Sequence, residues 1–175
     1  VVIPGSDVDY QKLTYDAQAF MPLWGGFVLR GYGKLGYGND LPFYKNFYAG
    51  GYGSVRGYDN SSLGPKYPSV IFQETAQPDQ DQEEVGGNAL VQFGTELAFP
   101  LPFKGDWARQ VRPVLFAKGA QVFDTKCDVP SGNILVNSSN VDIKQYCKDN
   151  YNFNFDNMRY SVGVGFTWIT MIGPL

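Results

Sequence analysis

The stretch Gly50–Lys66, GGYGSVRGYDNSSLGPK, holds five glycines and, near its middle, a single arginine, Arg56. A guanidinium is always charged and presents a planar fork of donors that can grip a carboxylate through two hydrogen bonds. Glycines allow backbone angles and close approaches that other residues resist. These residue types would suit a loop that fits an irregular space and holds a fixed cation against a partner, whereas a simple surface turn would not need them.

Other reactive groups are scarce. The chain has no histidine, which excludes histidine-based catalytic triads, zinc proteases and most catalytic metal sites. The glycine pattern GYGKLG (31–36) resembles a dinucleotide-binding turn, but it lies inside an alternating segment with no helix after it. The acidic run at 77–85 lacks the ligand spacing and turning glycine of a calcium loop. None of these motifs therefore supports a catalytic triad, a nucleotide site or a calcium site.

Charge and composition narrow the possible partners. The 175 residues carry 14 basic and 17 acidic side chains, a net charge of −3, which argues against a nucleic-acid partner. Aromatic residues make up 16% of the chain, including 12 tyrosines and 13 phenylalanines, which favours strands over helices. We expect an all-β protein.

Alternation of apolar and polar residues is the dominant pattern along the chain. It predicts five strands, at about 10–21, 27–37, 88–99, 111–124 and 157–170. These are longer than the roughly five or six residues of a typical globular strand. They suit the roughly 9 to 11 residues that a tilted strand needs to cross a bilayer.

The two faces of these strands differ in chemistry. One parity carries apolar side chains such as Leu13, Phe93 and Val162, which we expect to contact membrane lipid. The neighbouring positions, such as Thr14, Arg30 and Ser161, are polar and are expected to face a wet interior. No run of apolar residues is long enough for a transmembrane helix.

The connections between the expected strands alternate in length. Residues 22–26 and 100–110 form short connections, whereas residues 39–86 and 125–156 form long ones. Short turns on one side and long loops on the other are typical of outer-membrane barrels, with the long loops outside the cell. Five strands are too few to close such a barrel, so either further strands are missing here or the chain assembles with others, and we favour a fragment of a larger barrel.

Two cysteines, Cys127 and Cys147, lie in the second long loop among asparagine, serine and aspartate residues. Free buried thiols usually have apolar surroundings, so a disulfide in an oxidising compartment is the favoured interpretation. On the chain-entropy account such a bridge stabilises the fold by about 3 kcal/mol.

Three segments carry a resemblance to a known family. They are PFYKNFYAGGYGSVRGYDNSSLGPK (42–66), EEVGGNALVQFGTELAFP (83–100) and FTWITMIGPL (166–175). Together they resemble the superfamily of outer-membrane barrel insertases and two-partner secretion transporters. The resemblance implies that residues 1–175 are part of one antiparallel transmembrane β-barrel of sixteen strands. It also implies that loop 39–86 plugs the lumen and that loop 125–156 is extracellular.

The resemblance also implies which residues hold the loop. In the family the arginine of the VRGY motif, here Val55, Arg56, Gly57 and Tyr58, lies against the inner wall of the barrel. Glu96 aligns with the family's partner acid and has inward parity, so we expect an Arg56–Glu96 contact.

One position departs from the family. The next strand usually carries an acidic residue in a Phe-x-Asp-x-Gly pattern, and here Lys118 takes its place. A lysine should repel Arg56, so we expect Lys118 to share Glu96 or to pair with Asp59.

The implied function is the assembly and insertion of β-barrel proteins into the outer membrane of Gram-negative bacteria, with no enzymatic activity, no cofactor and no metal. The chain would belong to the central barrel subunit of the assembly machinery. Its implied partners are unfolded outer-membrane protein clients, accessory outer-membrane lipoproteins and membrane lipid. The alternatives are a two-partner secretion transporter, a passive porin and, from another class, a soluble β-sandwich that binds a ligand.

Overall fold

The computed structural model describes residues 9–65, 84–101, 103, 110–126, 133–136, 139–170 and 173–174. The strands are β1 (Gln11–Pro22), β2 (Val28–Asn39), β3 (Ala89–Ala98), β4 (Val111–Phe123), β5 (Asn133–Val136), β6 (Ser139–Asp142), β7 (Arg159–Thr170) and β8 (Gly173–Pro174). The helices are η1 (Trp24–Gly26), η2 (Phe43–Lys45), α2 (Ile143–Tyr151) and η4 (Phe155–Asn157). In this part of the chain no helix combines the length and hydropathy required to cross a membrane.

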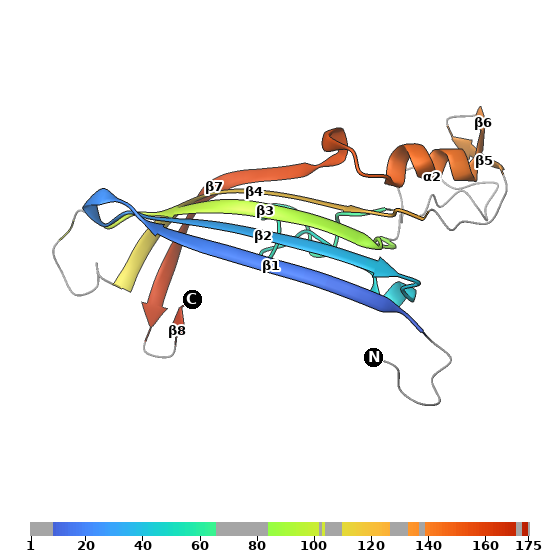
Figure 1. The fold of residues 1–175 in the computed structure, drawn as a ribbon. Helices are drawn as coiled ribbons and strands as arrows, with labels where there is room; N and C mark the ends of the chain where they lie inside the picture. The colour runs from blue at the N-terminus through green and yellow to red at the C-terminus, as the bar shows by residue number, and fades with distance from the viewer. Residues whose placement is uncertain are drawn as a thin grey trace.

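Five long antiparallel strands dominate the fold. The main sheet has the order β1-β2-β3-β4-β7-β8, so each strand pairs with the next long strand along the chain. The long strands β1, β2, β3, β4 and β7 begin and end within two residues of the predicted ranges. Figure 1 shows them as one long, curved ribbon sheet.

The connections differ at the two ends of the sheet. The short turn at η1 and the hairpin from β7 to β8 lie at one end, and α2 with the β5–β6 hairpin lies at the other (Figure 1). The η1 turn is closed by a 2.8 Å hydrogen bond from the Leu23 N–H to the Phe27 carbonyl. This one-sided distribution agrees with the sequence-based expectation. The helix α2 and the β5–β6 hairpin were not predicted.

Register assigns each side chain to a face. Across the sheet, Phe20 pairs with Arg30, Arg30 with Glu96, Glu96 with Phe116 and Phe116 with Gly163. Since all members of such a row project to the same side, Arg30 and Glu96 share one face, and the two-residue alternation places Asp16, Lys34 and Lys118 on it as well. The loop after β2 packs on this same face, which we call the inner face.

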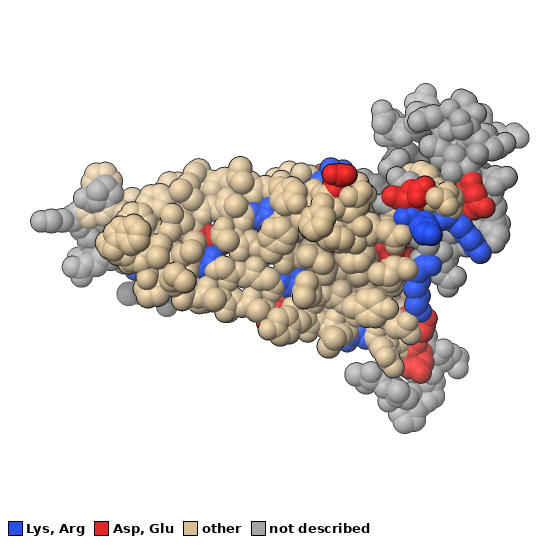
Figure 2. Space-filling model, turned by 45° about the horizontal axis from the view of Figure 1, so that its top comes forward, with Lys and Arg blue, Asp and Glu red and all other residues tan. Residues whose placement is uncertain are grey.

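The opposite, outer face is apolar and open. It presents Leu13, Val162, Val164 and Phe166, each at least 70% exposed. Figure 2 shows a broad surface of uncharged side chains, with charged groups gathered at the end that carries α2. An apolar surface of this extent is unfavourable in water and is suited to contact with lipid.

Substitution of Val162 by arginine tests this assignment. Val162 lies near the middle of β7 and is 80% exposed on the outer face. In the full-length protein refolded into lipid vesicles, we expect Val162→Arg to lower the free energy of unfolding by about 2–4 kcal/mol, because a cation must enter the bilayer. Denaturant titration measures the change. Thr14→Arg, at an exposed position of the inner face, is the control and should cost far less.

Candidate functional site

The VRGY motif lies in a compact turn. The Gly51 N–H donates to the Tyr58 carbonyl at 3.0 Å, and the Ser54 N–H donates to the Gly51 carbonyl at 3.1 Å. Gly57 has a φ of +93°, in the left-handed region that favours glycine, and a Cβ there would meet no atom within 4 Å. Backbone conformation, rather than crowding, therefore requires glycine directly after Arg56.

An apolar anchor fixes this turn to the sheet. The Val55 side chain is fully buried in a cluster with loop and strand residues. The other buried members are Phe47, Ala49 and Leu63 from the loop and Leu90, Ala120 and Val122 from β3 and β4. Burial of a valine side chain stabilises by about 1.5–3 kcal/mol. Val55 thus holds the loop while its neighbour Arg56 reaches the charged row.

Hydrogen bonds add specificity to the anchor. Ser54 Oγ donates to Gln92 Oε1 of β3 at 3.1 Å, and both residues are buried. The Tyr58 hydroxyl donates to the Tyr160 carbonyl of β7 at 3.5 Å. The loop therefore contacts β3 through Ser54, which precedes Arg56 in the chain, and β7 through Tyr58, which follows it.

Two aromatic rings enclose the Arg56 guanidinium. Its Cζ lies 4.4 Å from the centre of the Tyr52 ring and 4.5 Å from the centre of the Phe116 ring. Tyr52 belongs to the loop and Phe116 to β4 of the wall. Cation–π attraction to both rings holds this planar cation. A lysine ammonium is not planar and could not stack on a ring in the same way.

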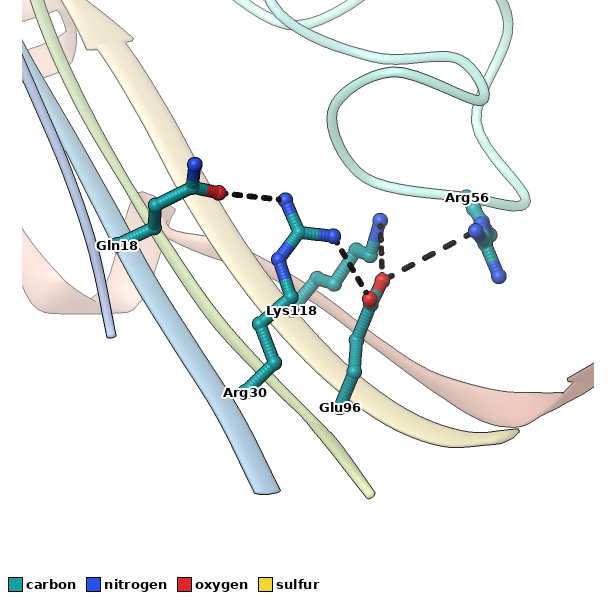
Figure 3. Close-up of polar contacts among 5 residues, drawn as sticks. All are labelled: Gln18, Arg30, Arg56, Glu96 and Lys118. Atoms are coloured by element: carbon teal, nitrogen blue, oxygen red, sulfur yellow. Dashed lines mark hydrogen bonds and ion pairs between the residues drawn. The ribbon is translucent and has the colours of Figure 1, made fainter. Parts of the chain in front are cut away.

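Glu96 is the centre of the charged cluster, as Figure 3 shows. Arg30 Nη1 lies 3.0 Å from Glu96 Oε2 and donates a hydrogen bond to it. Lys118 Nζ and Arg56 Nη2 lie 3.4 Å and 4.0 Å from the other carboxylate oxygen, Oε1. Gln18 Oε1 accepts from Arg30 Nη2 at 3.2 Å. Three cations, from β2, β4 and the loop, thus face one carboxylate of β3.

The structure places the predicted residues Arg56, Glu96 and Lys118 close together. Arg56 and Glu96 lie within ion-pair distance, and Lys118 shares Glu96, which was one of its two expected arrangements. The alternative partner Asp59 forms no ion pair with Lys118 in the described chain; it lies in the loop, where its carbonyl accepts from Ser62 Oγ. Arg56 makes no hydrogen bond to Glu96, because the 4.0 Å between Nη2 and Oε1 is too long for one.

Arg30 is the residue that sequence reasoning missed. Its inward parity was visible, but only the β2–β3 register places it directly opposite Glu96. The sequence does contain a signal for that register. Leu29 precedes Arg30 and Leu97 follows Glu96, so pairing the two leucines also pairs Arg30 with Glu96.

The cysteine prediction is only partly within the described residues. The Cys147 side chain in α2 is buried and is not a free thiol. Cys127 lies outside the described residues, so the Cys127–Cys147 disulfide stays a prediction. Within the described ranges no group of three or more histidine, cysteine, aspartate or glutamate side chains could hold a metal.

A strand glycine makes room for the aromatic enclosure. A Cβ at Gly163 of β7 would lie 2.7 Å from Cζ of the Phe116 ring, so Gly163→Ala must displace the ring that stacks on Arg56. We expect a loss of about 1–3 kcal/mol in the free energy of unfolding of the full-length protein, measured by denaturant titration. Gly31→Ala in β2 is the matched control, because a Cβ there meets nothing within 4 Å. Equal losses in the two variants would contradict the role of Gly163.

Taken together, the fold and the site define a class of protein. Long antiparallel strands with an apolar outer face, and a loop seated on a charged inner face, are features of a transmembrane β-barrel with an occupied lumen. The Omp85 superfamily domain matches residues 1–175, and the chain belongs to this superfamily.

Two relatives support the family assignment. The outer membrane protein assembly factor BamA of Neisseria meningitidis serogroup B (strain ATCC BAA-335 / MC58) is 34% identical over 182 residues. The match covers 100% of this chain but 22% of that protein, so the chain spans about a fifth of the relative's length. The crystal structure of BamA from Haemophilus ducreyi lacking POTRA domains 1-3 matches with a TM-score of 0.73 and 30% identity. That match covers 98% of this chain and 31% of the other. The sheet described above therefore corresponds to part of a BamA-like barrel.

Proposed function

We propose that this chain is part of the central barrel subunit that assembles and inserts β-barrel proteins into the bacterial outer membrane. The observation that carries the proposal is the Arg56 loop, which is anchored by Val55 and stacked against the Glu96 row of the inner face. A loop fixed at this many points suits a barrel that is braced from within rather than an open pore. The superfamily match and the named BamA relatives support the same function.

In this proposal the outer face of the sheet contacts lipid, and the inner face holds the loop. The outer face, with Val162 and Val164, contacts the acyl chains of the membrane. Loop 39–86 occupies the lumen and residues 125–156 lie on the extracellular side, within one barrel domain that includes residues 1–175. The Arg56 contacts lock the loop so that the wall keeps its curvature. The work is non-enzymatic, because it moves and folds polypeptide without changing covalent bonds.

The proposed partners follow from this role. Unfolded outer-membrane protein clients are the substrates, accessory outer-membrane lipoproteins bind the same subunit, and lipid surrounds the outer face. The protein acts in the outer membrane of Gram-negative bacteria.

Reconstitution tests the function. The full-length protein, with its co-purifying lipoproteins, is placed in liposomes, and the folding of an added unfolded barrel protein is followed by its resistance to SDS. We expect folding well above that in empty liposomes. Passage of one dedicated polypeptide into the liposome would instead indicate a secretion transporter. A steady ohmic conductance without client folding would indicate a porin, and either result would overturn the proposal.

A further inference from the structure

The space between the loop and the inner face is a polar cavity with unbalanced charge. Its volume is about 770 Å³, large enough for several water molecules. Its charged lining residues are the cations Arg30, Lys34, Arg56 and Lys118 and the carboxylates Asp16 and Glu96. Among the described residues of the lining, four cations against two carboxylates leave a surplus of two positive charges beside a low-dielectric wall, where charge repulsion is poorly screened.

The two carboxylates are already engaged. Asp16 Oδ1 lies 3.5 Å from Lys34 Nζ, so this pair is balanced. Glu96 receives the hydrogen bond from Arg30 and the ion pair from Lys118. Among the described residues, Arg56 and Lys118 therefore have only Glu96 as a carboxylate partner, and they share it with Arg30.

Hydrogen-bond acceptors are also short in this region. Arg56 donates no hydrogen bond to any described residue, although its side chain is only 24% exposed. The buried Nε atoms of Arg30 and Arg56 have no hydrogen-bond partner among the residues that the structure describes. The Lys118 side chain is 6% exposed, so bulk water does not solvate its ammonium freely. Buried cations and unpaired donors are unfavourable unless an acceptor reaches them.

We propose that this cavity binds a free oxyanion of the phosphate class between Arg56 and Lys118. A tetrahedral oxyanion offers several acceptor oxygens and matches the fork of a guanidinium and the three donors of an ammonium. It offsets the surplus charge and cross-links the loop, through Arg56, to β4, through Lys118. The inference rests on the charges and donors of the cavity and does not depend on the proposed insertase function.

The experiment measures the thermal unfolding of the full-length protein in detergent while inorganic phosphate replaces chloride at constant pH and ionic strength. We expect the unfolding temperature to rise by about 3 °C and then to saturate, because a ligand of the folded state stabilises it by mass action. In Lys118→Gln the half-saturating phosphate concentration should rise about tenfold, since one charge-assisted hydrogen bond is lost. Arg56→Gln should have a similar effect.

Lys148→Gln is the matched control, because Lys148 is an exposed cation of α2 outside the cavity. This variant should keep the wild-type response. Phosphate also stabilises proteins in general by exclusion from their surface, an effect that grows with concentration without saturating. A linear rise that is equal in all variants would therefore overturn the proposal. So would a wild-type protein that does not respond, because the surplus cations would then be met by a carboxylate from elsewhere in the protein.

Discussion

Glu96→Gln in the full-length protein is expected to lower the free energy of unfolding by about 2–4 kcal/mol in phosphate-free buffer. The substitution keeps the shape of the side chain but removes the only carboxylate that Arg30, Arg56 and Lys118 share among the described residues. Three like charges, two on the wall and one on the loop, then face one another, with Lys118 almost fully buried. Urea unfolding in lipid vesicles, followed by gel migration of the folded and unfolded forms, measures the change.

Lys118→Gln is the decisive comparison for Glu96→Gln. Both variants replace one charged side chain of the same cluster by a neutral amide, but Lys118→Gln reduces the positive surplus where Glu96→Gln increases it. In phosphate-free buffer we expect Lys118→Gln to be at least as stable as the wild type. Similar losses in both variants would show that packing, and not charge balance, decides the stability of this wall.

The strands could be predicted from sequence because their cause is local. A bilayer on one face and water on the other impose a period of two, and this period is visible in the segments of Leu13, Phe93 and Val162. Register depends on contacts between strands that are distant in the chain. For this reason Arg30 was assigned to the correct face, but its position opposite Glu96 became evident only with the fold.

The loop shows the same division between local and distant causes. Its glycines and the cation Arg56 predicted a fitted loop, and the resemblance supplied Glu96 as partner. The aromatic enclosure by Tyr52 and Phe116 depends on how the loop docks, which no local pattern encodes. The helix α2 was missed because it spans only nine residues in a polar segment, although Asp142 caps it by accepting from the Lys144 N–H.

Arg56→Ala is expected to lower the free energy of unfolding of the full-length protein by about 2–3 kcal/mol, chiefly through the loss of stacking on two rings. The ion pair with Glu96 adds little at 4.0 Å, since Arg30 and Lys118 are closer to that carboxylate. The loop should also become more accessible to added protease, which limited digestion of the folded protein in liposomes detects.

Arg56→Lys separates the charge of Arg56 from its shape. The ammonium keeps the positive charge but lacks the planar surface that lies between Tyr52 and Phe116, so we expect it to restore less than half of the stability lost in Arg56→Ala. Arg159→Ala, at an exposed position at the start of β7, is the control and should leave both stability and protease resistance unchanged. Full restoration by lysine would mean that charge alone holds the loop. An unchanged Arg56→Ala variant would mean that Val55 and the hydrogen bonds of the loop are sufficient, and the bracing role proposed for Arg56 would be wrong.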